Sequence, residues 1–317
     1  MAKSRLQIIP LGGLGEVGKN MTVFRYGDEI IVIDAGMAFP DETMPGVDIV
    51  IPDFSYLIEN RDKIKAILIT HGHEDHIGSL AYLLRDVSAP VYATRLTCGL
   101  IEGKLKEQKI GKYNLNVVKT GDEFRRGSFR FGFFHVCHSI PDSCGVYVRT
   151  PVGTVVHTGD FKFDHSPVDG EQTDMHKLAE LGRNGVLVLC ADSTNAQNPG
   201  YTLSEAVVSK SLRDAFHEVR GRIMPHSRPM CPAYRWRLMR LLKIKEKFVS
   251  SAVPWSMWWV SRLKWVTLRL RKAHLLNRRS SIIIAMTESA SSRRKPPAGA
   301  DPCRRYGHYF RIADSGK

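Results

Sequence analysis

An α/β (α+β) fold, with sheets sandwiched between helical layers, is predicted for the first 222 residues. Two observations lead to this prediction. Short segments rich in β-branched and aromatic residues, bounded by Gly, Pro or Asp, alternate with longer segments whose apolar residues recur at helical spacing. Neighbouring strand-like segments, such as 145–149 and 154–157, are also separated by the short distance of a β-hairpin.

The individual elements follow from the same patterns. We expect strands at 29–34, 65–70, 129–136, 145–149, 154–157 and 186–191. We expect helices at 78–87, 94–107, 175–181 and 204–220, the last of them starting at Ser204. This half of the chain contains no internal repeat.

The composition changes sharply after residue 222. The net charge is +14, yet residues 223–317 hold 21 of the 46 Lys and Arg, 4 of the 32 Asp and Glu, and all five Trp. The first 222 residues therefore carry about −3 and the remainder about +17. We expect one folded domain over 1–222 and, over 223–317, a basic Trp/Arg-rich tail that is disordered or translated out of frame.

Features of membrane or secreted proteins are not found in the sequence. No apolar run reaches the ~18–20 uncharged residues that a membrane span needs, and the first residues lack an apolar signal core. The six Cys form no C-x-x-C pair, which argues against a zinc ribbon. A cytoplasmic protein without a membrane partner is the expectation.

The strongest functional signal is the metal loop, His71-Gly72-His73-Glu74-Asp75-His76, which follows the strand at 65–70. A strand that ends in a loop fixes the backbone while closely spaced imidazoles and carboxylates turn inward, as a site for two metals requires. Imidazole and carboxylate without thiolate suit Zn²⁺, with Mn²⁺ as the competitor. The alternative is a histidine-rich surface loop, which rarely concentrates four ligand-type residues in six positions.

Two further ligand candidates, His138 and Asp160, also stand where a strand runs into a loop. Either residue alone is more typical of a turn or a helix cap, but beside the metal loop both become ligand candidates. His135 and His157 alternate with apolar neighbours inside strands, which favours a structural role or a supporting position behind the ligands over metal binding.

The motifs around these residues resemble the metallo-β-lactamase superfamily and, within its beta-CASP branch, the ribonuclease J family. The metal loop, His138 and Asp160 match the superfamily in order and spacing. The resemblance covers about residues 4–222 and rests on PLGGLGEVGKNM (10–21), VIDAGMAFPDE (32–42), GVDIVIPD (46–53), LTCGLIEGKLKE (96–107), HSIPDS (138–143), PVGTVVHTGDFKFD (151–164) and ADSTNA (191–196).

The resemblance implies an αββα sandwich with a beta-CASP domain inserted late in the chain, here incomplete or aberrant. It implies RNA as substrate, cleavage internally and from the 5′ end, and homo-oligomers in full-length relatives. It also implies two Zn²⁺ per site, with Mn²⁺ or Mg²⁺ as alternatives. The implied ligands are His71, His73 and His138 for one metal and Asp75, His76 and Asp160 for the second, with Asp160 bridging.

The same resemblance assigns further roles. Asp75, His76 and Asp160 become the catalytic set, because the metals they hold activate a water for phosphodiester hydrolysis. Asp34 becomes a carboxylate that orients the metal loop from behind, and Asp192 matches the first beta-CASP motif. Glu74 is expected to support the loop without binding metal.

The resemblance ends near residue 222. His226, His274 and His308 stand outside the context of the family's late histidine ligand, so that ligand and the RNA-binding residues stay unassigned. The abrupt gain of Trp and Arg resembles translation in a shifted frame, and we expect a frameshift near codon 223.

Other readings of the sequence compete with the ribonuclease. One is a small-molecule hydrolase that uses the same metal loop, and another is an inactive fragment whose basic tail binds RNA electrostatically. The segment 13–18 also spells G-x-G-x-x-G, but a strand follows where a nucleotide-binding helix would begin. We expect this segment to pack beside the metals.

Overall fold

The computed structural model describes residues 5–218, 223–226 and 282–285. The chain divides into two compact units, one containing residues 1–201 and the other beginning at Thr202. Each unit is described by itself. No helix among the described residues is long and apolar enough to cross a membrane.

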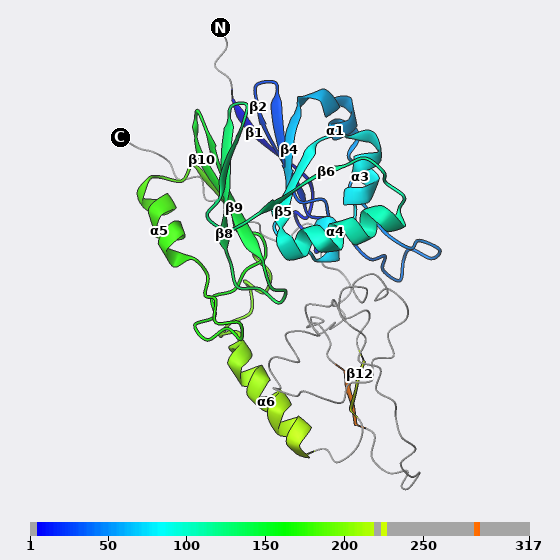
Figure 1. Cartoon of the computed structure of the whole chain (residues 1–317), viewed down its shortest axis with the longest axis vertical. Helices are drawn as coiled ribbons and strands as arrows, with labels where there is room; N and C mark the ends of the chain where they lie inside the picture. The colour runs from blue at the N-terminus through cyan, green and yellow to red at the C-terminus, as the bar shows by residue number, and fades with distance from the viewer. Residues whose placement is uncertain (1–4, 219–222, 227–281, 286–317) are drawn as a thin grey trace, which may run out of the picture. The chain divides into compact units, whose positions relative to one another are not determined.

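The first unit contains a six-stranded sheet with its strands in chain order (Figure 1). Its strands are β1 (Leu6–Gly12), β2 (Met21–Tyr26), β3 (Glu29–Ile33), β4 (Ile64–Leu68), β5 (Pro90–Thr94) and β6 (Asn114–Val118). The pairs β1–β2 and β2–β3 are antiparallel, and β3 to β6 run parallel to one another. The carboxyl ends of β3 and β4 therefore lie side by side.

A five-stranded sheet forms the other half of this unit, in the order β11-β10-β9-β8-β7. Its strands are β7 (Glu123–Arg126), β8 (Phe129–His135), β9 (Cys144–Thr150), β10 (Gly153–His157) and β11 (Val188–Cys190). Strands β7 to β10 are antiparallel neighbours, and β11 pairs in parallel with β10. The predicted hairpin of 145–149 with 154–157 is confirmed by the β9–β10 pairing.

Helices cover the outer face of each sheet (Figure 1). The helices of this unit are α1 (Ser55–Glu59), η1 (Arg61–Lys63, a 3-10 turn), α2 (Glu74–Ile77), α3 (Leu80–Asp86), α4 (Arg95–Glu107) and α5 (Met175–Arg183). Leu57, Leu83 and Ile101 bring α1, α3 and α4 into one core with the first sheet. Leu181 brings α5 onto the second sheet.

Side-chain alternation along the strands separates these layers. In β3, Ile31 and Ile33 face the second sheet, whereas Ile30 and Val32 face the helices. The core between the sheets also contains Phe129, Phe131 and Phe133 of β8, all fully buried. Because successive residues of a strand point to opposite faces, a strand buried on both sides needs an unbroken apolar run. Residues 30–33 of β3 (IIVI) are such a run, and the predicted αββα layering is confirmed.

The second unit contains α6 (Glu205–Glu218) and the parallel pair β12 (Ile223–His226) and β13 (Ile282–Ala285). The hydroxyl of Ser204 accepts a hydrogen bond from the backbone N–H of Ala206 (3.2 Å), so α6 begins where predicted. Apart from β12 and β13, the segment 223–317, for which we expected a disordered or out-of-frame tail, lies outside the described residues. His274 and His308 lie outside them too.

Candidate metal centre

The metal loop leaves the buried end of β4 and leads into the short helix α2. His71 and His76 are each 1% exposed. Residues 34–37, after β3, lie against the loop, because the N–H groups of Ala35 and Met37 donate to the carbonyl oxygens of His76 (2.8 Å) and Glu74 (3.0 Å). A side chain at Gly36 would prevent this approach, since its Cβ would lie 1.5 Å from the Asp75 carbonyl oxygen. The loop is thus fixed from both sides.

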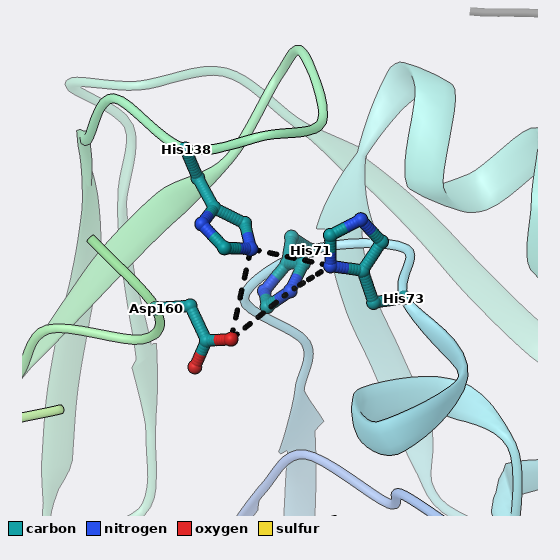
Figure 2. A group of neighbouring side chains, drawn as sticks. All are labelled: His71, His73, His138 and Asp160. Atoms are coloured by element: carbon teal, nitrogen blue, oxygen red, sulfur yellow. Dashed lines mark hydrogen bonds and ion pairs between the residues drawn. The ribbon is translucent and has the colours of Figure 1, made fainter. Parts of the chain in front are cut away.

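Four predicted ligands meet in one cluster, drawn in Figure 2: His71 and His73 from the metal loop, and His138 and Asp160 from loops that follow β8 and β10. Nδ1 of His73 lies 3.1 Å from Nε2 of His71 and 3.2 Å from Nε2 of His138. The carboxylate oxygen Oδ2 of Asp160 lies 3.9 Å from His71 Nε2 and 3.6 Å from His138 Nε2.

These distances fit a shared cation. A tetrahedral Zn²⁺ with ligand bonds of ~2.0–2.1 Å holds its ligand atoms about 3.3–3.4 Å apart, and the four atoms here are separated by 3.1–3.9 Å where measured. Three imidazoles and one carboxylate are also a donor set that zinc accepts. The residues present therefore fit a divalent metal.

A second group adjoins the first and consists of Asp75 and His76, together with His71. Nε2 of His76 lies 3.6 Å from Oδ2 of Asp75 and 3.2 Å from Oδ1 of Asp160. Asp160 thus turns one carboxylate oxygen toward each group, which is the geometry a bridging ligand needs. Sequence order placed these residues in one site, and the structure brings all six together.

Asp34 is buried directly behind the two groups. Its carboxylate accepts hydrogen bonds from the backbone N–H of Thr70 (2.8 Å) and the Thr70 hydroxyl (2.9 Å). Its Oδ2 lies 2.8 Å from Nδ1 of His76, so Nδ1–H can donate to this carboxylate and Nε2 is the ring nitrogen that faces the site. The position has φ of 61°, a left-handed conformation that Asp tolerates better than most residues.

The buried histidines of the site differ in the direction of their pKa shifts. Burial lowers the pKa of His138 to about 3 and holds the pKa of His71 well below its usual value, with neighbouring histidines contributing. Both imidazoles are therefore neutral and ready to bind a cation. Burial also disfavours the charged form of His76, but the carboxylates of Asp34 and Asp160 outweigh it and hold the pKa of His76 well above its usual value.

The two carboxyl groups of the site differ in the same way. Burial raises the pKa of Asp75, with His76 opposing and Asp160 adding to the shift. Burial acts in the same direction on Asp160, but the nearby His76, His138 and His73 lower the pKa of Asp160 well below its usual range. Asp160 is therefore ionised and suited to sit between two cations.

Comparison with known proteins shows the family to which this chain belongs. Residues 14–191 match the Metallo-beta-lactamase superfamily. The chain belongs to this superfamily. A crystal structure of a protein of unknown function from Enterococcus faecalis V583 is similar in fold to this chain, with a TM-score of 0.57 at 15% identity, covering 75% of this chain and 63% of that one.

Among members of the superfamily, this chain is homologous to ribonuclease J. It is 51% identical to ribonuclease J of Thermus thermophilus over 229 residues and 50% identical to that of Synechocystis over 222 residues. It is 46% identical to ribonuclease J 2 of Staphylococcus aureus over 244 residues. These alignments cover 69–76% of this chain, and the chain spans 35–43% of the length of these relatives.

Three residues that the sequence singled out lie outside both ligand groups. Asp192 donates its backbone N–H to the Thr158 hydroxyl (3.1 Å), and its carboxylate accepts from the N–H of Thr194 (2.7 Å). His135 contacts the carbonyl oxygen of Glu171 (3.2 Å), and the ring of His157 accepts the N–H of Gly159 (3.1 Å). Neither histidine belongs to the two metal groups found among the described residues, as expected for residues that are not ligands.

Asn20 and Asp142, for which the sequence predicted no individual role, hold the metal loop and the loop that carries His138. Asn20 donates its backbone N–H and its Nδ2 to the carbonyl oxygen of Asp75, each at 3.1 Å, and Nδ2 lies 3.1 Å from His76 Nε2. Asp142 accepts the N–H of Leu96, in the first turn of α4, at 3.0 Å and so fixes the loop that carries His138. Their neighbours in space are distant in sequence, so spacing gave no signal for either. Glu74 lies outside both ligand groups and forms an ion pair with Lys104 of α4.

Proposed function

We propose that this chain is a metal-dependent ribonuclease of the ribonuclease J type that hydrolyses RNA phosphodiester bonds. The observation that carries the proposal is the pair of ligand groups sharing Asp160, in a chain 46–51% identical to three ribonucleases J over the region that contains them. Two adjacent divalent cations suit phosphodiester hydrolysis, because together they stabilise the attacking and the leaving oxygen. No observation in the described residues favours a small-molecule substrate.

Each residue has a part in this mechanism. His71, His73 and His138 would hold one metal and Asp75 and His76 the second, with Asp160 shared between them. Bound divalent metals lower the pKa of a water and neutralise charge on the reacting phosphate. Asp34 holds the Nδ1 proton of His76, which directs the Nε2 lone pair into the site. Asp34 thereby acts on the chemistry through His76 and not by contact with RNA.

The finer parts of the proposal rest on the relatives and the donor set. We propose zinc as the metal, with manganese or magnesium as alternatives, since imidazole and carboxylate ligands serve all three to different degrees. We also propose 5′-to-3′ exonuclease and endonuclease action in RNA processing, a cytoplasmic location, and a homo-oligomer. The beta-CASP assignment of Asp192 and the boundary at residue 222 belong to the same set of proposals.

The test is cleavage of a 5′-monophosphorylated, end-labelled RNA by the purified chain with zinc or manganese. Ribonuclease J of Thermus thermophilus serves as the positive control and His76→Ala as the blank. We expect metal-dependent cleavage that His76→Ala abolishes. The rate should be orders of magnitude below the control, because phosphate positioning contributes ~7–11 kcal/mol and no residue that positions the scissile phosphate at the metals is identified in the described part of the chain. Cleavage that persists with a chelator or with His76→Ala would contradict the proposal.

A separate proposal concerns the basic segment after residue 222. We propose that it arises from a shifted reading frame, because it is rich in Arg and Trp and holds only 4 of the 32 Asp and Glu of the chain. Sequencing the gene across the codons around 222 tests this directly. An uninterrupted frame that encodes the same segment would refute it, and restored cleavage after frame correction would support it.

A further inference from the structure

Three arginines form a row across the outer face of the second sheet. Arg125 of β7 stands opposite Arg130 of β8, and Arg130 stands opposite Arg149 of β9. All three point away from the core between the sheets, because their neighbours Phe124, Phe129 and Phe131 pack into it. Strands lie ~4.8 Å apart, and like charges directly opposite one another destabilise a sheet. The row therefore destabilises the sheet, and strand pairing alone gives no reason for three arginines at these positions.

The acidic residues near the row neutralise only one end of it. Arg149 pairs with Glu123 (2.9 Å) and Glu180 (3.7 Å). The guanidinium of Arg125 donates from Nε to the carbonyl oxygen of Gly127 (3.4 Å). Within the part of the chain that the structure describes, neither Arg125 nor Arg130 has a carboxylate partner. The nearby Glu29 is engaged with the backbone N–H of Ser128 (2.6 Å).

The unpaired arginines line a hollow. It has a volume of about 280 Å³ and is bounded by Arg125, Ser128, Phe129, Arg130, Arg149 and Thr150. Guanidinium groups bind phosphate oxygens through two parallel hydrogen bonds. The Thr150 hydroxyl already donates to the carbonyl oxygen of Gly153 (2.8 Å), so the two uncompensated guanidiniums are the groups that make this concave surface suited to phosphate.

We propose that this hollow, the arginine row site, binds the phosphate backbone of single-stranded RNA at a distance from the metals. Strand β8 leads from Arg130 at one end to His135 and then to the ligand His138 at the other. Five residues of extended strand span about 17 Å, so one RNA reaching both places must be several nucleotides long. The choice of RNA over another phosphate compound rests on the proposed ribonuclease function. The site anchors substrate and takes no part in cleavage.

The experiment measures RNA binding in the absence of turnover. A fluorescently labelled single-stranded RNA is titrated with the full chain in excess EDTA, by anisotropy, at several salt concentrations. The test variant is Arg125→Gln/Arg130→Gln. The matched control is Lys109→Gln/Lys112→Gln, which removes the same charge from exposed residues beyond α4. Circular dichroism of each variant establishes that the fold is retained.

The expected result is weaker binding by the arginine variant than by the lysine variant. Each lost phosphate contact lowers the salt slope by ~0.7 for single strands, so two lost contacts reduce the change in affinity between 50 and 200 mM salt by about sevenfold. Arg125→Lys/Arg130→Lys should keep most of the slope but bind more weakly, because lysine cannot form the paired bonds.

Equal affinities and slopes for the arginine and lysine variants would overturn the proposal. So would stronger competition by polyglutamate than by unlabelled RNA, which would indicate an acidic protein segment as the occupant. Failure of the ribonuclease proposal is recognised separately, as absent metal-dependent cleavage by the unaltered chain, since this binding assay contains no active metal.

Discussion

Asp34→Asn is expected to lower the metal affinity of the group that contains His76 and to leave the affinity of the other group nearly unchanged. Asp34 accepts from both the N–H and the hydroxyl of Thr70 and also contacts Nδ1 of His76. An amide of the same shape retains one acceptor oxygen, which the Thr70 N–H can use. Its NH₂ group would then face Nδ1 of His76 and favour the tautomer that carries its proton on Nε2. A protonated Nε2 cannot bind a metal.

The size of the effect follows from the role of such outer partners. Their loss typically costs 10–100-fold in metal affinity, or about 1.4–2.7 kcal/mol. The loss should fall mainly on the group containing Asp75 and His76. His71, His73 and His138, which make no direct contact with the substituted carboxylate, should keep the other metal close to its original affinity.

Calorimetric titration of metal-free protein with Zn²⁺ or Mn²⁺ measures both affinities. In the unaltered chain we expect two unequal metals, since the first group offers four ligands and the second has fewer of its own. Asp34→Asn should weaken the looser one at least tenfold. Thr173→Ser, a conservative change of a buried hydroxyl outside both groups, is the control. Unchanged affinities in a folded Asp34→Asn protein would refute the tautomer argument.

Three further predictions test the rest of the site. His73→Ala/Asp75→Ala should remove both metals, because it takes a ligand from each group; unchanged metal content by elemental analysis would contradict the assignment. Asp142→Ala should weaken the metal held with His138 up to ~10-fold, through the loss of its bond to α4; an effect on unfolding alone, with no change in affinity, would assign Asp142 a merely structural role. Metal-free protein should lose stability as pH falls from about 6.5 toward 3, because burial lowers the pKa of His138 to about 3 while the unfolded chain protonates near its usual value. Urea unfolding across this range should show a smaller loss in His138→Ala, and an equal loss would refute that attribution.

The sequence by itself determined the features whose information is local. The spacing of apolar residues was enough to predict the alternation of strands and helices. Every strand and helix expected before residue 222 is present. The candidate ligands His71, His73, Asp75 and His76 are neighbours in the chain, so a strand followed by a loop was enough to indicate a metal site. Chain order and resemblance together indicated His138 and Asp160 as candidate ligands and Asp34 as a supporting carboxylate.

Several strands were not predicted from the spacing of apolar residues, for identifiable reasons. Strand β1 contains Pro10 and shows a register shift before Gly12, and β7 is four residues long with three charged side chains. Such segments become strands because neighbouring strands supply hydrogen-bond partners, which local preference does not reveal.

Only the tertiary structure decided which distant groups meet. Parallel pairing of β3 with β4 places Asp34 beside Thr70 and His76. The loops after β8 and β10 then bring His138 and Asp160 to the same point. The contacts of Asn20 and Asp142 arise in the same way, across 55 and 46 residues of sequence. Side chains converge on a metal through the register of strands and the docking of loops, and these depend on packing across the whole fold, which no short segment encodes alone.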